Sequence, residues 1–474
     1  MSCAFLRVSA IVSVFLLISG CGGTSGGGAG NGGGGSNPPP PPQTTVTFTI
    51  TGPAPTAVAT QIGSGPFTAA TITSAGVLTL TVPSGTANFA VAFVCPPSSL
   101  VYPAAIETGA AEQTDEWVYE ASTEDGNALT GSCPMGPQTP AGATGTMTGT
   151  IDASAAGATF VDVVASNSSF TAETMSPSPL YVPTFSINFA APAGSDRVEA
   201  VAYFQYFDLP CGNCDAPSVV SVKNLNNQAV PGALNGGNPV VFSAGDKVVN
   251  EPLSFTNVPE GWGASTDVTY KTGSVGGFDL GTFGPLIQTA PTNAYSAVPA
   301  AAIQPGDNYQ FYASASGGGP LPAAYMSVGT NQMVAAATGA VSISFPAAWG
   351  YTGPTPAALP VFDVSYSGFL GKPAAFNEVG FAWMTPQAGG PTSMGFCLEV
   401  AASGNYLNGT TTVAVPDLSG VGGFVPPPAS GELINWSAEL ANVWDQAFVT
   451  TGFKDTASSE NMNSVINSGV YTVP

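Results

Sequence analysis

The sequence predicts an all-β protein made of tandem antiparallel β-sandwich domains. Residues 45–51, Thr-Val-Thr-Phe-Thr-Ile-Thr, alternate polar with apolar side chains, and residues 76–82 do the same. This two-residue period is typical of strands that bury one face. Short β-branched stretches then recur between Gly, Pro, Asn and Ser turns at a spacing of about 8–12 residues, which is typical of sandwiches.

The absence of a convincing helical period is the third observation. Residues 432–450 are the one stretch that could be helical, because Leu433, Trp436, Leu440 and Trp444 fall near helical spacing. This stretch could form a helix or two strands, and the sequence leaves the choice open.

Residues 1–20 have the features of a secretory signal peptide. Arg7 supplies the early positive charge, residues 8–18 are largely apolar, and small residues precede Cys21. The apolar run is too short for a spanning helix, which needs about 20 apolar residues. These features also fit an ordinary secretory signal that happens to end near a cysteine.

The four residues Ile18-Ser19-Gly20-Cys21 resemble the lipobox of bacterial lipoproteins. The resemblance implies that the signal is removed before Cys21 and that this cysteine becomes the acylated N-terminus. Because Gly22 and not aspartate follows, the resemblance also implies the outer membrane or the cell surface. We therefore expect the chain to contact the membrane through its lipid anchor.

Residues 21–43 are predicted to be a tether. The segment is almost all glycine up to Ser36 and then contains the five prolines 38–42. Glycine-rich chains are flexible, and a proline run forms an extended polyproline segment. Such a tether would hold a folded body away from a membrane.

Composition excludes several classes of function. The chain has 7 Lys+Arg against 29 Asp+Glu, so it offers no basic footprint for nucleic acid. It has no histidine, which removes Ser-His-Asp and Cys-His catalysis and histidine zinc sites. No cofactor is indicated. Only 8% of residues are charged, so the surface should be largely neutral and polar.

A weak internal repeat places a Pro-x-Gly between strands. Residues 78–94 parallel residues 185–203, and residues 253–262 echo the first half. Proline fixes its backbone angle and glycine permits a positive φ, so we expect a hairpin corner. The unit resembles the transthyretin-like sandwiches of carboxypeptidase regulatory domains and bacterial surface repeats. The resemblance implies a fold class, transthyretin-like or Ig-like, and no functional residue.

Three β-rich domains are expected after the tether. The first covers residues 44–138 and is followed by a Pro/Gly/Thr linker. The second covers residues 146–315, and the third covers residues 332–474. Because the linkers resemble the loops, these boundaries are less sharp than the strands.

The cysteines can be assigned in an oxidising compartment. Cys95 ends a strand and Cys133 closes the loop that follows, so we predict that they form a disulfide. Cys211 and Cys214 form a C-x-x-C between two predicted strands, which favours a local disulfide over a redox site. We expect Cys397 to be a buried free thiol.

An acidic stretch at residues 107–125 is the sharpest candidate for metal chemistry. Calcium takes six to eight oxygen ligands, but the spacing does not match a calcium loop. We expect a solvated acidic loop. The weak calcium candidates are Glu112, Asp115, Glu116, Glu124 and Asp125.

Aromatic and carboxylate side chains could also bind or cleave a sugar. The aromatic candidates are Trp117, Tyr119, Trp262, Trp349, Tyr351, Trp383 and Trp436. Most aromatics at such positions belong to sandwich cores. The scattered carboxylates are Asp162, Glu173, Asp267, Asp279, Asp363, Glu378 and Glu399. Retaining glycoside hydrolysis needs two carboxylates about 5 Å apart, and the sequence singles out no pair.

These observations predict a lipid-anchored cell-envelope protein with a structural or ligand-binding role and no enzymatic activity. A polysaccharide or another envelope protein is the expected type of partner. The alternative is a carbohydrate-binding or carboxylate-based carbohydrate-active protein at the cell surface.

Overall fold

A computed structural model describes most of the chain after the tether. The described residues are 43–96, 113–133, 144–158, 160–165, 171–174, 184–190, 194–204, 218–230, 232–272, 276–287, 292–317, 323–337, 339–369, 376–385, 394–442 and 462–474. The predicted signal peptide, Cys21 and the tether lie outside them, as do Cys211, Cys214 and Glu112. The all-β prediction is confirmed, because almost every described element is a strand.

Residues 43–132 form a sandwich of seven strands, which we call module 1. A three-stranded sheet of order β4-β1-β7 faces strands of order β3-β2-β5-β6. β1 pairs antiparallel with β4 and parallel with β7. The strands are β1 (Gln43–Thr51), β2 (Ala57–Ile62), β3 (Thr68–Ala69), β4 (Val77–Pro83), β5 (Asn88–Val94), β6 (Gln113–Ser122) and β7 (Ala128–Ser132).

Modules 2 and 3, residues 144–241 and 249–344, repeat the same strand order. Module 2 has β8 (Thr144–Asp152), β9 (Phe160–Ala165), β10 (Thr171–Thr174), β11 (Thr184–Ala190), β12 (Gly194–Phe204), β13 (Ser218–Val230), β14 (Gly232–Ala233) and β15 (Val240–Val241). Module 3 has β16 (Val249–Thr256), β17 (Gly263–Thr272), β18 (Gly276–Ile287), β19 (Thr292–Ala297), β20 (Asn308–Gly317), β21 (Ala323–Ala335) and β22 (Val341–Ser344). In each module the first strand pairs antiparallel with the fourth and parallel with the last.

Module 4, residues 361–472, repeats the first six strands of this order. They are β23 (Val361–Asp363), β24 (Phe376–Thr385), β25 (Met394–Ser403), β26 (Thr412–Ala414), β27 (Leu433–Ala441) and β28 (Met462–Thr472). The short helices of the described chain are α1 (Gly404–Leu407), η3 (Thr123–Asp125), η4 (Ser154–Ala156), η5 (Leu234–Gly237) and η6 (Ala244–Asp246). The order therefore recurs four times, where the sequence predicts three domains. The ambiguous residues 433–441 form a strand.

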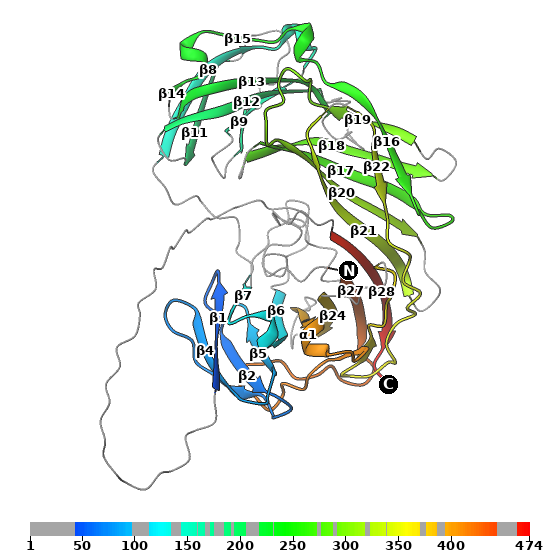
Figure 1. Cartoon of the computed structure of the whole chain (residues 1–474). Coiled ribbons are helices and arrows are strands. Elements are labelled where there is room, and N and C mark those ends of the chain that lie inside the picture. The colour runs from blue at the N-terminus through cyan, green and yellow to red at the C-terminus, as the bar shows by residue number, and fades with distance from the viewer. Residues whose placement is uncertain are drawn as a thin grey trace, which may run out of the picture.

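Modules 3, 4 and 1 share one sheet of twelve strands, of order β18-β17-β20-β21-β28-β27-β24-β25-β6-β5-β2-β3. β21 pairs antiparallel with β28, and β25 pairs parallel with β6. Edge strands with unpaired backbone groups tend to add further strands; here the edges of three modules satisfy one another. Figure 1 shows the resulting arc, with β16, β19 and β22 on its outer side.

Alternation along the strands decides which side of this sheet each side chain occupies. In modules 3 and 4 the apolar side chains Phe311, Val328 and Trp436 are buried on the outer side, under β16, β19, β22, β23 and β26. In module 1 the apolar core lies on the opposite side of the shared sheet. Trp117 and Tyr119 point to the other side, where β1, β4 and β7 cover them.

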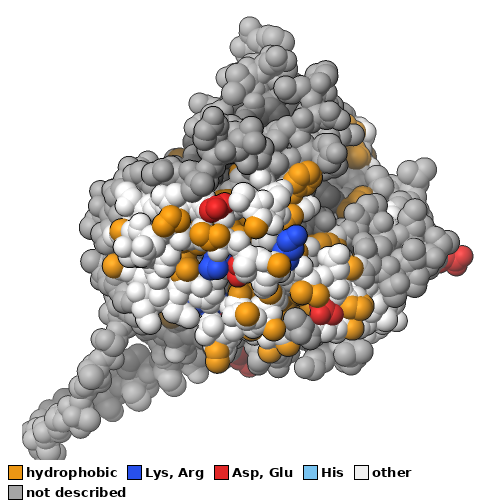
Figure 2. Space-filling view, turned by 90° about the horizontal axis from the view of Figure 1, so that it is seen from above, with side chains coloured by type: hydrophobic (Ala, Val, Ile, Leu, Met, Phe, Trp, Pro, Cys, Tyr) orange, Lys and Arg blue, Asp and Glu red, His pale blue; other side chains and the backbone are white. Residues whose placement is uncertain are grey.

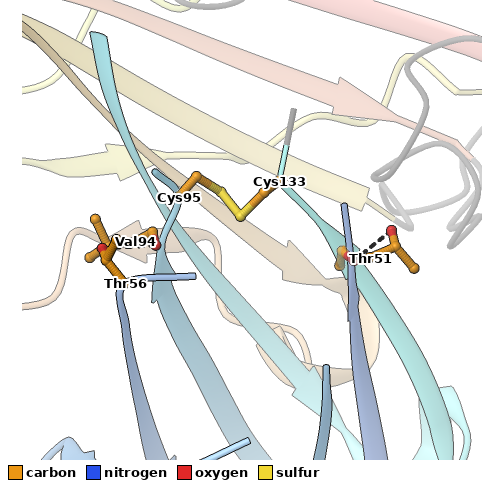
Figure 3. The surroundings of a disulfide bond; sticks show 6 residues. Thr51, Thr56, Val94, Cys95 and Cys133 are labelled. Atoms are coloured by element: carbon orange, nitrogen blue, oxygen red, sulfur yellow. Dashed lines mark hydrogen bonds between the residues drawn. A yellow bond between two sulfur atoms is a disulfide. The ribbon is translucent and has the colours of Figure 1, made fainter. Parts of the chain in front are cut away.

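The disulfide Cys95–Cys133 joins the two sheets of module 1, as predicted. Cys95 follows β5 and Cys133 follows β7, with 5.3 Å between their Cα atoms. Figure 3 shows the bridge beside Thr51 and Thr56, whose hydroxyls donate to the carbonyls of Gly131 and Val94. The bridge closes a sequence separation of 38 residues.

The repeated Pro-x-Gly does not form a hairpin corner, contrary to the prediction. β4 pairs with β1 whereas β5 pairs with β2, so the Pro83-Ser-Gly85 turn carries the chain from one sheet to the facing sheet. The Thr86 N–H donates to the Pro83 carbonyl at 3.1 Å, and Gly85 has a φ of 86°. The turn at residues 259–261 connects β16 to β17 in the same way. The copy at residue 192 lies outside the described residues.

Module 2 rests on module 3 through a buried cluster of charges. Arg197 of β12 contacts Asp307 at 2.6 Å and Glu199 at 2.5 Å. The Tyr270 hydroxyl and the Gln304 N–H donate to the second oxygen of Asp307 at 2.5 and 2.6 Å. Glu199 is 0% exposed and Asp307 is 4% exposed. Each buried carboxylate therefore lies beside the same guanidinium.

The described part of the face seen from above carries few charged side chains, which agrees with the composition. Figure 2 shows the molecule from above, with hydrophobic side chains scattered among white uncharged groups and only a few blue or red ones. Scattered apolar side chains are normal on a soluble surface.

Candidate functional site

The predicted acidic loop is in large part the buried strand β6. Glu116 is 2% exposed and Glu120 is 7% exposed. They alternate with Trp117 and Tyr119, so the carboxyls point away from the module 1 core and toward module 4. The prediction of a solvated loop is therefore wrong for this strand, since Trp117, Val118 and Tyr119 make it apolar on both faces.

Residues 403–425 of module 4 cover these carboxyls. Glu116 accepts a hydrogen bond from the Val425 N–H at 2.6 Å, and Glu120 accepts one from the Tyr406 hydroxyl at 3.3 Å. Burial raises the pKa of Glu116 to about 7, although the Val425 N–H opposes the shift. Burial likewise raises the pKa of Glu120 to about 7, against the effect of Tyr406.

The remaining calcium candidates are not brought together. Asp125 accepts from the Ser122 N–H and the Asn405 amide, both at 2.7 Å, and from the Ser403 hydroxyl at 2.5 Å. Asp115 is half-buried and Glu124 is exposed. Within the described chain no group of three or more Cys, Asp or Glu side chains could hold a metal ion.

A polar sheet face lies on the inside of the arc. We call it the inner face. It is the side of β20, β21, β28, β27 and β25 that points away from the apolar side chains buried under β16, β19, β22, β23 and β26 (Figure 1). The strand registers place one set of polar side chains on it, all at most 8% exposed. They are Gln310, Ser327, Asn331, Glu399, Ser437, Glu439, Ser464 and Ser468.

The hydroxyl and amide groups of the inner face retain unused hydrogen-bonding capacity. The Gln310 amide donates to the Asn331 side chain at 3.2 Å, but its own oxygen has no partner among the described residues. The Ser464 hydroxyl also has none, although it is 1% exposed. Ser464 pairs with Gly329, where an added Cβ would come within 2.9 Å of its oxygen. The glycine therefore leaves room for this hydroxyl.

One end of the inner face is open to solvent, and we call it the rim. Leu433 is 58% exposed and Val470 is 40% exposed. Val470 lies directly opposite Asn435, and the half-buried Tyr325 lies opposite Ser468. Neighbouring strands are about 4.8 Å apart, and successive residues on one face of a strand are about 7 Å apart. β21, β28 and β27 therefore offer a footprint of roughly 10 by 14 Å at the rim.

The inner-face carboxylates Glu399 and Glu439 lie on strands that are not neighbours. Glu399 lies on β25 and Glu439 on β27, with β24 between them, which places the two backbones about 10 Å apart. A retaining pair needs about 5 Å. Glu378 of β24 is paired with Glu439 through its backbone, but its side chain is not among the described ones.

Cys397 differs from its prediction. It is buried on β25, as expected, but it is disulfide-bonded to a cysteine outside the described residues. It is therefore not a free thiol.

The predicted aromatic residues belong to the cores. Trp117, Tyr119, Trp262, Trp349 and Trp436 are all at most 9% exposed, and Tyr351 stacks on Trp349. The Trp383 side chain lies outside the described residues. Gln310, Asn331, Glu439 and Ser464 were not predicted from the sequence. Their polar alternation along β20, β21, β27 and β28 was the available signal.

Comparisons with known proteins add no assignment. No protein-family model matches the chain, and no curated protein has a significantly similar sequence. Across the described residues, no helix combines the length and the apolar character needed to cross a membrane.

Proposed function

We propose that this chain is a lipid-anchored cell-envelope protein that binds a neutral, hydroxyl-rich polymer such as a polysaccharide at the rim of its inner face. The observation that carries the proposal is the solvent-open rim, at which the polar inner face of β20, β21, β28, β27 and β25 ends. The lipobox-like residues 18–21 and the tether support the location.

The chemistry of the rim suits an uncharged sugar. Ser468, Ser437 and Asn435 supply hydroxyl and amide groups, while Tyr325, Leu433 and Val470 supply apolar surface for the less polar face of a ring. With 29 acids and 7 bases in the chain, an anionic polymer would be repelled. The ligand class is therefore a neutral glycan.

A thermal-shift screen of the purified protein against neutral and anionic polysaccharides tests binding, because a ligand of the folded state raises the melting temperature. We expect a shift with a neutral polymer. Tyr325→Ala and Asn435→Ala should weaken binding about tenfold or more. Ser342→Ala, an exposed serine of β22 in the outer sheet, is the matched control and should leave binding unchanged. Equal loss in all three variants, or no shift with any polymer, contradicts the proposal.

The anchor has a separate test. We expect mass analysis of the membrane-bound protein to show a chain that begins at an acylated Cys21, because the lipobox resemblance implies cleavage before this residue. An unmodified N-terminus elsewhere would leave only the binding proposal.

A structural role is the second candidate. Its support is the continuous twelve-stranded sheet, which joins three modules through β21–β28 and β25–β6 pairing. We further propose that the modules are transthyretin-like. The Pro-x-Gly turns at residues 83–85 and 259–261, each of which connects the two sheets of one sandwich, support this assignment.

A further inference from the structure

The interface between modules 1 and 4 depends on segment 403–425, which runs from the end of β25 through α1 to Val425. Leu407, Leu418, Val421 and Phe424 of this segment are buried in the same core cluster as Ala90, Ala92 and Val118 of module 1. The Asn88 amide donates to the Tyr406 carbonyl at 2.8 Å. The segment thus closes over the outer side of β5 and β6.

Among the described residues, the carboxyls under this segment have no basic neighbour. The sequence contains no histidine, and no Lys or Arg between Arg7 and Arg197 or between Lys372 and Lys454. The other ionisable groups that face this interface from β6, η3 and the segment are Asp125, Asp417 and Tyr406. Glu432 lies just beyond the segment and caps the Ala429 N–H. None of these groups can neutralise a buried carboxylate.

An unpaired buried carboxylate is costly unless it binds a proton. The contacts of Glu116 and Glu120 remain available to the protonated acid, because its carbonyl oxygen still accepts from the Val425 N–H and the Tyr406 hydroxyl. Protonation therefore removes the charge without removing the hydrogen bonds.

We propose that segment 403–425 is an acid-fastened clamp: protonated Glu116 and Glu120 hold it on module 1, and loss of both protons loosens it. Loosening would free the outer side of β5 and β6 and the sheet junction between β6 and β25. The clamp is independent of glycan binding on the inner face.

The direction of the pH effect follows from the raised pKa values. Each carboxyl has a pKa of about 7 when clamped and the ordinary glutamate pKa of 4.5 when exposed. The closed clamp therefore binds more protons than the open one between these values. Closure is fully favoured below pH 4.5 and weakens as the pH rises through 7.

Amide hydrogen exchange of the full protein, read by mass spectrometry at pH 5.5 and 8.5, tests the clamp. After correction for intrinsic exchange rates, opening of residues 418–425 should be ~30-fold more favourable at pH 8.5 for each carboxyl that titrates. E116Q and E120Q should each remove their share of this dependence, because glutamine keeps the acceptor and cannot ionise.

The matched control is D417N, which changes an exposed carboxyl of the same segment that accepts from the Ser419 N–H. It should keep the full pH dependence. Equal protection at both pH values in the unmodified protein overturns the proposal, as does a full pH dependence in the E116Q/E120Q double variant. A melting temperature for each variant separates loosening of the clamp from loss of the fold.

Discussion

Two of the inter-module interfaces of this protein, between modules 2 and 3 and between modules 1 and 4, bury acids in opposite ways. Between modules 2 and 3, Glu199 and Asp307 contact Arg197, and Tyr270 and Gln304 donate to Asp307 as well. Between modules 1 and 4, the donors that Glu116 and Glu120 have among the described residues are uncharged. The first interface therefore neutralises its buried acids with a guanidinium. The second can neutralise its acids by binding protons.

The difference predicts opposite sensitivities. The interface with a guanidinium should be insensitive to pH near neutrality but intolerant of losing its one cation. The interface without a cation should tolerate neutral substitutions and respond to pH. Three substitutions and one pH titration test this contrast.

The largest effect should come from Arg197→Met. Methionine fills similar volume but leaves Glu199 and Asp307 buried without a cation, and breaking a buried pair in this way costs about 3–5 kcal/mol. Urea unfolding at pH 7 measures the loss. A change below ~1 kcal/mol would mean that the hydrogen bonds, not the cation, stabilise this interface.

The next effect is the pH dependence of the unmodified protein. A pKa raised from 4.5 to about 7 makes the folded state lose stability as the pH rises from about 5 to 8. The free energy of unfolding should fall by at most about 3 kcal/mol for each of Glu116 and Glu120. Urea midpoints across this range should fall with pH, and those of E116Q/E120Q should fall less. Parallel curves would contradict the account.

These carboxyls also show what the sequence could and could not predict. The strands of module 1 follow from their alternation, and Cys95–Cys133 was predicted from the positions of its cysteines. The burial of Glu116 was not predictable, because its partner Val425 lies 309 residues away along the chain. The acidic composition of residues 107–125 suggested solvent, and only the tertiary structure shows which face module 4 covers.

The modular division was harder still. A Pro-x-Gly turn connects the two sheets in modules 1 and 3, but stretches of similar composition also connect the modules. The inner face could be inferred as polar from residues 308–316, where polar residues alternate with Tyr309, Phe311 and small alanines. Nothing local shows that β21 will pair with β28, which lies about 140 positions further along the sequence.

A smaller effect is expected from Tyr406→Phe. The variant keeps the ring packed against module 1 and removes the hydroxyl that donates to Glu120 at 3.3 Å. The loss should be about 0.5–1.5 kcal/mol at high pH. This hydrogen bond lowers the pKa of Glu120. Its removal should therefore move the midpoint of the pH-dependent loss of stability to higher pH. A downward shift in the urea titration would contradict the assigned contact.

The smallest effect should come from Lys223→Met. Lys223 contacts Asp246 at 3.3 Å, and both side chains are partly exposed. Such pairs contribute about 0–1 kcal/mol. Measured beside Arg197→Met, this variant shows whether the cost of losing a cation follows burial. A similar decrease in the free energy of unfolding in the two variants would contradict the claim that this cost follows burial.

The most direct test follows both interfaces in one hydrogen-exchange experiment. The Val425 amide reports on the module 1–4 interface, and the Gln304 amide, which donates to Asp307, reports on the module 2–3 interface. Between pH 5.5 and 8.5, after intrinsic correction, the account predicts that protection falls at Val425 and stays constant at Gln304. Equal changes at both amides, or constant protection at Val425, would contradict it.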